Sequence, residues 1–423
     1  MGGRAQANNI NILNSIRELS SLAYQDRIPT ATAENVNAIY KDIMNVEAIR
    51  NAFVNALVER IAIVAINDKI WTNPLRDVKD SAMPYGAMEQ EIFVNFCKAH
   101  QFNPSAGYEE AFAFYEANVM AAYHKLVPPM QYAVTISYDQ LRSAFTNDFG
   151  IRDLIKAKVN ALYNGANWDE FLITKQLIES GYSNGALYPV NVPEITDKET
   201  AESALIAMKA TIGKMKFPKP MYNIAGATSF SEKADLILIT TPDNLAYIDV
   251  KALAMAYNEG RADVDVRTIE VDEFSNENIV AFLCDRRWFR IRDNYRTMSN
   301  QGNGASLTWN YFYTVSEMFS VSPFMPAVVF TKETPGVTSI TINTTEYTAG
   351  SQVKLDCTVV GSGYIPKSVD WEITGGATSK DTAIIPGSNI LIVGADETGT
   401  IALKVTSRYL NSVSKAGNLT KAV

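Results

Sequence analysis

The stretch TNDFGIRDLIKAKVNALYNGANWDEFLITKQLIESGY, residues 146–182, decides the fold. Its first apolar residues recur at the spacing of one helix face: Ile151, Ile155, Val159 and Leu162. Arg152, Asp153, Lys156 and Lys158 lie largely on the other faces, so this half predicts an amphipathic helix. After Asn164-Gly165 the apolar positions shift to Trp168, Phe171 and Leu172, which indicates either a kinked helix or two helices.

The ends of this helix also carry signals. Asn147 or Asp148 can cap its start, and Gly181 is placed to end it in a left-handed conformation. A continuous helix of roughly 32 residues is about 48 Å long at 1.5 Å per residue. That length favours a strut over an ordinary domain helix, and elements on both sides of it in the sequence are expected to pack against it.

Composition limits the classes of function. The 423 residues are 47% hydrophobic and 20% charged, which is typical of a folded protein with two or three domains. A net charge of −8 disfavours a protein that clamps nucleic acid over its whole surface. Three widely separated cysteines (Cys97, Cys284 and Cys357) favour a reducing compartment. The N-terminal MGGRAQANNINIL has no apolar core, so we expect neither a secretion signal nor a membrane anchor.

The chain before the long helix is only partly regular. Helices are predicted within 10–24 and 32–60, and a strand over 60–68. Residues 71–75 indicate a turn, 76–96 extended chain around Pro84 and Gly86, and 130–141 a strand. Residues 68–138 therefore form a long excursion with little core of its own. Such a segment is expected to pack on something else, which includes another chain.

The chain after the long helix alternates between helical and strand patterns. Helices are predicted over 199–215 and 243–258, strands over 234–241, 266–274 and 278–294, and a polar loop over 296–306. One aromatic, β-prone run, 307–330, closes this mixed α and β region. Residues 331–336 read as a linker. The strands after it are short and alternating, with Trp371 at their centre, which predicts an immunoglobulin-like β-sandwich over 337–423.

Motifs that would carry catalysis or metal binding are weak. Gly181-Tyr-Ser183-Asn-Gly185 matches the hydrolase nucleophile motif, but a helix precedes it and both histidines come earlier, so a helix end and turn is the better interpretation. His100 and His124, with Cys97, lack the paired spacing of a zinc site, and a surface or interface role is favoured. Asp263 and Asp265 fit a solvated face. We predict no catalytic residue, cofactor or metal site, and therefore no enzyme.

Arginines are concentrated in DRRWFRIRDN, residues 285–294. Arg286, Arg287, Arg290 and Arg292 with Trp288 and Phe289 could stack on nucleic acid. On a strand, Trp288, Arg290 and Arg292 would share one face, and Asp285 and Asp293 can pair with neighbouring arginines. Interface or solvated arginines are the favoured interpretation.

The order of these segments resembles a known family. It is similar to the Hong Kong 97-type fold of tailed-phage major capsid proteins, and most similar to small podophages of the phi twenty-nine type. The stretches that carry the resemblance are LVERIAIVAIND with NPLRDVKD (57–80), MPYGAMEQEI (83–92), VNALYNGANWDEF (159–171), DRRWFRIRDN (285–294) and residues 307–330. The tail, with TAGSQVKLDCTV and SVDWEI, resembles a bacterial Ig-like group-two domain.

The resemblance implies an α+β capsid fold with a C-terminal Ig-like β-sandwich. The implied parts are an N-terminal arm (1–67), an extended loop with its return strand (68–138), a spine helix (139–181), an axial domain (182–306), a closing strand of the peripheral domain (307–330), a linker (331–336) and the Ig-like domain (337–423). The extended loop would lie over a neighbouring subunit, which explains its missing core.

The implied function is a shell subunit that encloses double-stranded DNA in an icosahedral or prolate head. Its expected partners are other copies in hexamers and pentamers, a scaffold protein, a portal and host surface glycans, with assembly in the host bacterial cytoplasm. The alternatives are an Ig-bearing surface adhesin or carbohydrate-binding protein, and an enzyme with an Ig-like appendage. The residues predicted at subunit interfaces are Pro74, Arg76, Pro84 and Tyr85 in the extended loop, and Arg290 and Arg292 in the axial domain.

Overall fold

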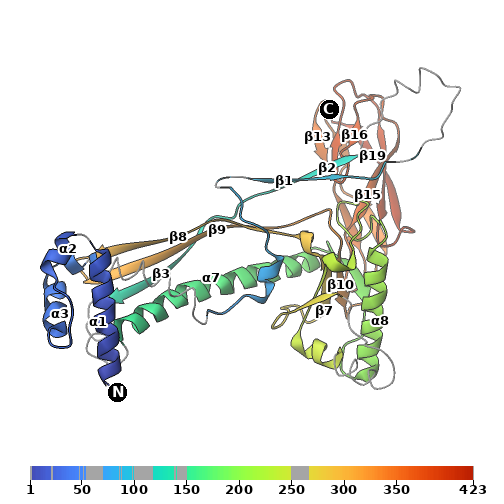
Figure 1. The fold of residues 1–423 in the computed structure, drawn as a ribbon. Coiled ribbons are helices and arrows are strands. Elements are labelled where there is room, and N and C mark those ends of the chain that lie inside the picture. Colours follow the sequence, from blue (N-terminus) through green and yellow to red (C-terminus); the bar gives the residue numbers. More distant parts are fainter. Residues whose placement is uncertain are drawn as a thin grey trace.

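The computed structural model describes residues 2–20, 22–46, 48–50, 52–53, 70–84, 86, 88–97, 99, 118–137, 140, 150–248 and 266–422. One long helix, α7 (Gly150–Ser183), joins a group of helices at the N-terminal end of the molecule to a mixed sheet at the other end (Figure 1). Its 34 residues correspond to about 51 Å. The helix is continuous through Asn164-Gly165, so the strut predicted from the sequence is confirmed as one helix.

Two details of α7 differ from the prediction. Ile155, Val159 and Leu162 are buried as expected, but Trp168 and Leu172 remain 44% and 37% exposed. Gly181 is still helical, and the left-handed turn is made by Gly185 at φ +64°. The caps predicted at Asn147 and Asp148 lie outside the described residues.

The N-terminal helices are α1 (Gly2–Leu19), α2 (Leu22–Arg27) and α3 (Val36–Asn45). The single helix predicted within 10–24 is thus two helices, and the strand predicted over 60–68 lies outside the described residues. Ile16, Ile39 and Phe53 share one hydrophobic core with the first half of α7 and with Trp309 and Tyr311. This core fixes the N-terminal helices to the far end of the strut.

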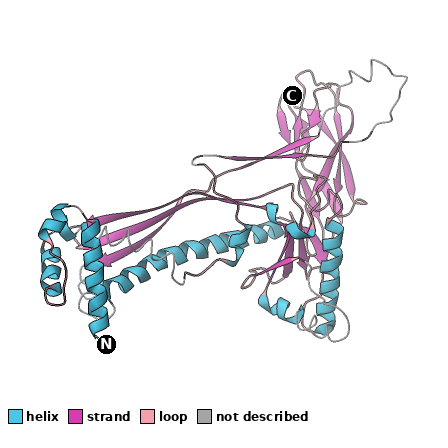
Figure 2. Cartoon of the chain, in the orientation of Figure 1, coloured by secondary structure: helices cyan, strands magenta, loops and turns pink. Residues whose placement is uncertain are grey.

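A long three-stranded antiparallel sheet runs alongside α7 (Figures 1 and 2). Its order is β3 (Met130–Ser137), β9 (Thr308–Val321) and β8 (Phe289–Asn303). The strand predicted over 130–141 is confirmed for residues 130–137, whereas Gln140 is helical. The loop predicted over 296–306 is wrong for residues 296–303, which lie in β8, and is confirmed for the turn at 304–306. Met298, Asn300 and Gly302 pair with Tyr313, Tyr311 and Trp309 of β9. This cross-strand pairing holds a Gly- and Asn-rich segment in a strand that its local propensity does not favour.

The second sheet has the order β4 (Tyr188–Asn191), β10 (Ala327–Thr331), β7 (Ile279–Asp285), β5 (Leu236–Thr240) and β6 (Arg267–Glu270). Side chains alternate between its faces. Ile237, Phe282 and Val329 share a core with the C-terminal half of α7. Leu238 and Leu283 share another with α8 (Lys198–Met215), whose start carries an Asp197–Thr200 capping box.

Two predicted single strands are broken. The strand predicted over 278–294 is β7, a 3₁₀ turn η3 (Arg286–Trp288) and the start of β8, because the buried Asp285 carboxylate accepts a hydrogen bond from Arg287 N at 2.8 Å and caps the turn. Trp288 is therefore buried in that turn and does not share a strand face with Arg290. The closing strand predicted over 307–330 is β9 and β10, interrupted around Pro323 and Pro326, and the two strands join different sheets. The helix predicted over 243–258 is helical through Ile248, and its remainder lies outside the described residues.

The C-terminal module, residues 337–422, is built of short strands: β11 (Ser339–Ile342), β12 (Glu346–Tyr347), β13 (Gln352–Lys354), β14 (Cys357–Val360), β15 (Val369–Gly375), β16 (Ala383–Ile384), β17 (Ile390–Ile392), β18 (Ile401–Ser407) and β19 (Ser414–Lys421). They form three sheets around two apolar clusters, and Trp371 packs against both. Strands are present within the five stretches predicted from the sequence (337–343, 351–359, 367–375, 389–394 and 399–407), but the single strand predicted over 351–359 is two strands, β13 and β14, in different sheets. The sequence does not reveal β12, β16 or β19.

The C-terminal module is docked on the rest of the chain by buried polar contacts. The Tyr364 hydroxyl accepts from Leu187 N at 3.2 Å and donates to Leu187 O at 2.9 Å. Lys367 N donates to Gly185 O at 2.8 Å. A Cβ at Gly185 would lie 2.4 Å from the Ile365 carbonyl oxygen, so the close approach requires glycine there.

Candidate assembly interface

The ribbon formed by β1 (Glu89–Val94) and β2 (Val119–His124) has two unlike faces. Its inner face, with Met120, Phe93 and Ala122, packs on Ala225, Ala227 and Phe324. Its outer face exposes four large side chains by 46–65%: Ile92, Val94, Val119 and Tyr123. Ile92 pairs with Ala121 and Val94 with Val119, so these side chains form one continuous patch. An apolar patch of this kind on a strand pair marks a contact surface.

A buried cluster clamps the base of the ribbon to β8 and β9. The Glu91 carboxylate accepts hydrogen bonds from Arg290 and from Ser322 Oγ at 2.8 Å, and lies 3.2 Å from His124 Nε2. His124 Nδ1 lies 2.7 Å from Ser320 Oγ. Burial alone would raise the pKa of Glu91, but its hydrogen bond to His124 and the charge of Arg290 lower it. The inner face of the ribbon is thus held by an ionised carboxylate.

The residues that precede β1 are bonded to β8, the strand that also carries Arg290. Arg292 Nε donates to Glu89 Oε2 at 2.7 Å, and Arg292 also pairs with Asp80 at 3.3 Å. Two backbone bonds run in parallel, from Asp80 N to Ile291 O and from Met83 N to Asp293 O, at 2.9 and 2.8 Å. The ribbon therefore leaves the body from a fixed position on β8.

A second charged network, centred on Lys79 and Arg296, joins α7, β8 and β9. Lys79 Nζ contacts Glu170 of α7 at 2.7 Å, Glu317 of β9 at 2.6 Å and Asp293 of β8 at 2.8 Å. Arg296 contacts the same three carboxylates at 2.7 to 3.0 Å. The side chains of Lys79, Glu170 and Glu317 are less than a tenth exposed, so screening by water is weak.

The carboxylates of this network differ in the direction in which their pKa is shifted. Burial raises the pKa of Glu317 to about 7, and Asp293 and Glu170 add to the rise against the pull of Lys79. Burial opposes ionisation of Glu170 too, but the charges of Lys79 and Arg296 outweigh it and lower its pKa. The pKa of Lys79 is raised, because the attraction of Glu170 and Glu317 exceeds the effect of burial. At neutral pH, Glu317 is the member of the network that gains or loses a proton.

The structure places the predicted interface residues in two groups. Pro74 and Arg76 lie exposed in the 3₁₀ turn η1 (Pro74–Val78), and Pro84 is exposed just before the ribbon. Tyr85 lies outside the described residues. Arg290 and Arg292 are not solvated: their side chains are 14% and 22% exposed and paired inside the chain. A contact of Arg290 and Arg292 with a neighbouring subunit therefore stays a prediction. Within the chain, these two side chains hold the ribbon in position.

The other sequence motifs have structural explanations. Gly181 and Ser183 lie in the last turn of α7 and Gly185 in the turn after it, as the helix-end interpretation predicted. His124 is not a surface residue, because it is buried between Glu91 and Ser320. Asp285 pairs with Arg287 and Asp293 with Arg296, as predicted. His100, Asp263 and Asp265 lie outside the described residues.

Metal-binding clusters and membrane-spanning helices are both absent from the described part of the chain. No group of three or more His, Cys, Asp or Glu side chains there is arranged to hold a metal ion. None of the helices described is long and apolar enough to cross a membrane.

Sequence reasoning missed the charged network that joins the chain before the ribbon to α7, β8 and β9. Lys79, Glu170 and Glu317 are isolated charges in the sequence, and only the fold brings them together. The one available signal was a charged residue on a predicted buried face, Glu317 in an aromatic strand and Glu170 beside Phe171.

The fold is that of a phage capsid chain. It is similar to the capsid structure of Staphylococcus phage Andhra, with a TM-score of 0.50 and 12% identity over 63% of this chain and 85% of that chain. The chain belongs to the Phi29-like phage major capsid protein family, whose model matches residues 13–331. The major capsid protein of Bacillus phage PZA is 29% identical over 94% of this chain and 89% of its own length. That of Bacillus phage GA-1 is 31% identical over 71% of this chain and 64% of its own length.

The sequence prediction of a phage major capsid protein is therefore confirmed, and copies of this chain assemble into the capsid shell. Membership of the family rests on the body of the chain up to residue 331. The C-terminal module lies beyond the family match, which therefore identifies neither its type nor its role.

Proposed function

We propose that the outer face of the β1–β2 ribbon is buried against a neighbouring copy of the chain in the shell. The observation that carries this proposal is the patch of Ile92, Val94, Val119 and Tyr123, which no described part of its own chain covers. The clamps on Glu89 and Glu91 give the ribbon a fixed position, so little ordering cost remains when it meets a neighbour.

The described elements are assigned to the parts of the capsid fold that the resemblance implies. In the proposal, residues 68–129 are the extended loop, α7 is the spine helix and residues 184–288 are the axial domain. The sheet of β3, β8 and β9 is assigned to the peripheral domain, so residues 130–137 leave the extended loop and residues 289–303 leave the axial domain in which the sequence had placed them. Because β10 pairs with β4 and β7, we place residues 327–331 with the axial domain and not with the closing strand. Pro74, Arg76 and Pro84 lie exposed at the root of the loop and are candidates for the same contact.

The proposed setting is the head of a tailed phage. The shell, of icosahedral or prolate shape, would enclose double-stranded DNA, with hexamers and pentamers of this chain, a separate scaffold protein and a portal, and would assemble in the host bacterial cytoplasm. The net charge of −8 suits a container that must not trap its DNA.

The C-terminal module is proposed to be an Ig-like domain of the bacterial group-two type on the outer surface of the shell. Its short strands around Trp371 support this, as do the two apolar clusters that Trp371 joins. Binding of host surface glycans is the function proposed for it. A glycan array probed with assembled particles tests this, and equal signals from particles with and without residues 337–423 would reject it.

Assembly of charged variants tests the ribbon proposal. Ile92→Asp introduces a charge into the outer face, where each buried aliphatic side chain contributes about 1.5–3 kcal/mol, and this contact repeats across the shell. We expect the variant, co-expressed with scaffold, to fold but to yield few shells by electron microscopy. The matched control is Ile206→Asp on α8, since Ile206 is 60% exposed and Ile92 is 59% exposed. Shells formed by Ile92→Asp at the control's yield would reject the proposed contact.

A further inference from the structure

The position of the ribbon tip is set by contacts other than the clamps at the base of the ribbon. A two-stranded ribbon is only marginally stable in water without something to pack against. The Glu91 and Glu89 clamps lie at the end of the ribbon where Glu89 pairs with His124. The opposite end, where Val94 pairs with Val119, reaches the C-terminal module (Figure 1).

The first connection at the tip runs through the loop 223–228. This loop is rigid, because the Asn223 side chain accepts from Ala227 N and donates to Ala227 O at 2.9 and 2.6 Å. On the ribbon side, Thr228 N donates to Asn95 Oδ1 at 2.8 Å. The loop therefore fixes the end of β1.

The C-terminal module grips the same loop from its other side. Arg408 Nη1 donates to the carbonyl oxygens of Asn223 and Ile224 at 3.2 and 2.6 Å. Within the module the same side chain is held by Asp370 at 2.6 Å and by the Val369 carbonyl at 2.9 Å. The Arg408 side chain itself is only 8% exposed, whereas its partner Asp370 is 60% exposed.

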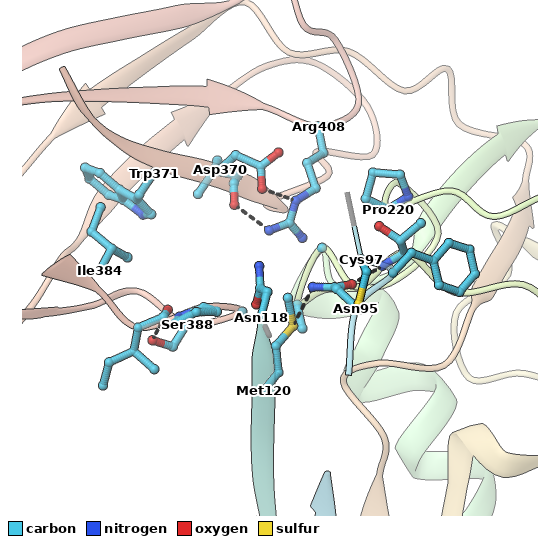
Figure 3. A pocket seen from close by; sticks show the side chains of 18 residues that line it. Asn95, Cys97, Asn118, Met120, Pro220, Asp370, Trp371, Ile384, Ser388 and Arg408 are labelled. Atoms are coloured by element: carbon cyan, nitrogen blue, oxygen red, sulfur yellow. Dashed lines mark hydrogen bonds and ion pairs between the residues drawn. The ribbon is translucent and has the colours of Figure 1, made fainter. Parts of the chain in front are cut away.

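A direct contact completes the connection. Gly387 of the module has φ +71°, and a Cβ at this residue would lie 2.5 Å from Met120 Sδ on β2. Figure 3 shows Arg408 and Asp370 on one side of the pocket and Asn118 and Met120 facing them. The Met120 side chain thus packs directly on the Gly387 backbone, and a side chain at residue 387 would force it to move.

We propose that the C-terminal module is an intramolecular brace that sets the position of the ribbon, through Arg408 and the loop 223–228 and through Gly387 against Met120. The brace belongs to a single chain, so it does not depend on which neighbour the outer face meets. The module then contributes to assembly by presenting the ribbon, in addition to any role at the outer surface.

Hydrogen exchange of the unassembled full-length protein tests the brace. Gly387→Ala pushes a methyl group into Met120, and we expect exchange of the backbone amides in 119–124 to rise about tenfold. The matched control is Gly350→Ala, because Gly350 has φ +72° in the same module but its Cβ would meet only Ala395, at 3.7 Å. The control carries the same backbone strain without the ribbon contact.

Two further variants keep the test decisive. Met120→Ala combined with Gly387→Ala should show no more exchange than Met120→Ala alone, because the clash is gone. Arg408→Ala should raise exchange in both 223–228 and the ribbon, whereas Lys415→Ala, an exposed charge on β19, should change neither. Equal ribbon exchange in Gly387→Ala and Gly350→Ala, or in Arg408→Ala and Lys415→Ala, would overturn the proposal. Because the protein is unassembled, failure here leaves the contact between subunits untouched.

Discussion

Replacing Lys79 with methionine tests how the root of the ribbon is held. The ammonium group lies 2.6 to 2.8 Å from three carboxylates, and each pair attracts by about 6 kcal/mol at an effective dielectric constant of 20. Most of that attraction offsets the cost of removing the charges from water. Methionine keeps the shape but leaves Arg296 alone with the buried Glu170 and Glu317 and the half-buried Asp293, which costs about 3–5 kcal/mol.

The size of this loss depends on pH. Below pH 7 Glu317 takes up a proton, so one of the three attractions to Lys79 weakens. We therefore expect the loss of unfolding free energy in Lys79→Met to be largest near pH 8 and to fall by about a third at pH 5. Urea unfolding of the unassembled protein, followed by tryptophan fluorescence at both pH values, measures it.

Lys332→Met provides the control. Lys332 pairs with Glu194, but the two side chains are 30% and 62% exposed, so its loss should cost less than about 1 kcal/mol at either pH. A loss below about 1 kcal/mol for Lys79→Met at pH 8, or an equal loss at both pH values, would refute the reasoning.

Two other changes have defined outcomes. Burial raises the pKa of Glu317 from 4.5 to about 7, so its contribution to stability is present below pH 4.5 and lost as the pH rises through 7. Glu317→Gln should therefore gain about 3 kcal/mol of unfolding free energy relative to wild type between pH 4.5 and 8 in urea titrations. A difference between the two proteins that stays constant with pH would contradict this. Tyr364→Phe removes the hydroxyl that accepts from Leu187 N and donates to Leu187 O, which should cost about 1–3 kcal/mol and speed proteolytic release of the C-terminal module; release at the wild-type rate would show that this bond does not hold the module.

The sequence predicts the strut and the strands that carry their own periodicity. Ile155, Val159 and Leu162 repeat at helical spacing and are buried. The continuous apolar run within 234–241 likewise predicts the buried strand β5, which covers residues 236–240. These elements are decided by local pattern, so a single sequence contains the information. The capsid class came from the order of such segments and not from any one motif.

The missed features depend on contacts between distant residues. The polar segment 296–303 is a strand only because β9 pairs with it. The Lys79 network joins residues that are up to 238 positions apart, and a charge within an apolar pattern does not tell which distant residues pair with it. The outer face of the ribbon was also hidden, because Phe93 points inward and Ile92 and Val94 outward, so the sequence lacks the alternation that would separate the two faces.

The most direct test of the proposed contact is a cryo-electron microscopy map of the assembled shell that resolves side chains around the ribbon. We predict that Ile92, Val94, Val119 and Tyr123 of one subunit are covered by a neighbouring subunit, with the Glu91–Arg290 clamp intact beneath them. A map in which this face remains in solvent, while shells are closed and complete, would contradict the proposed contact.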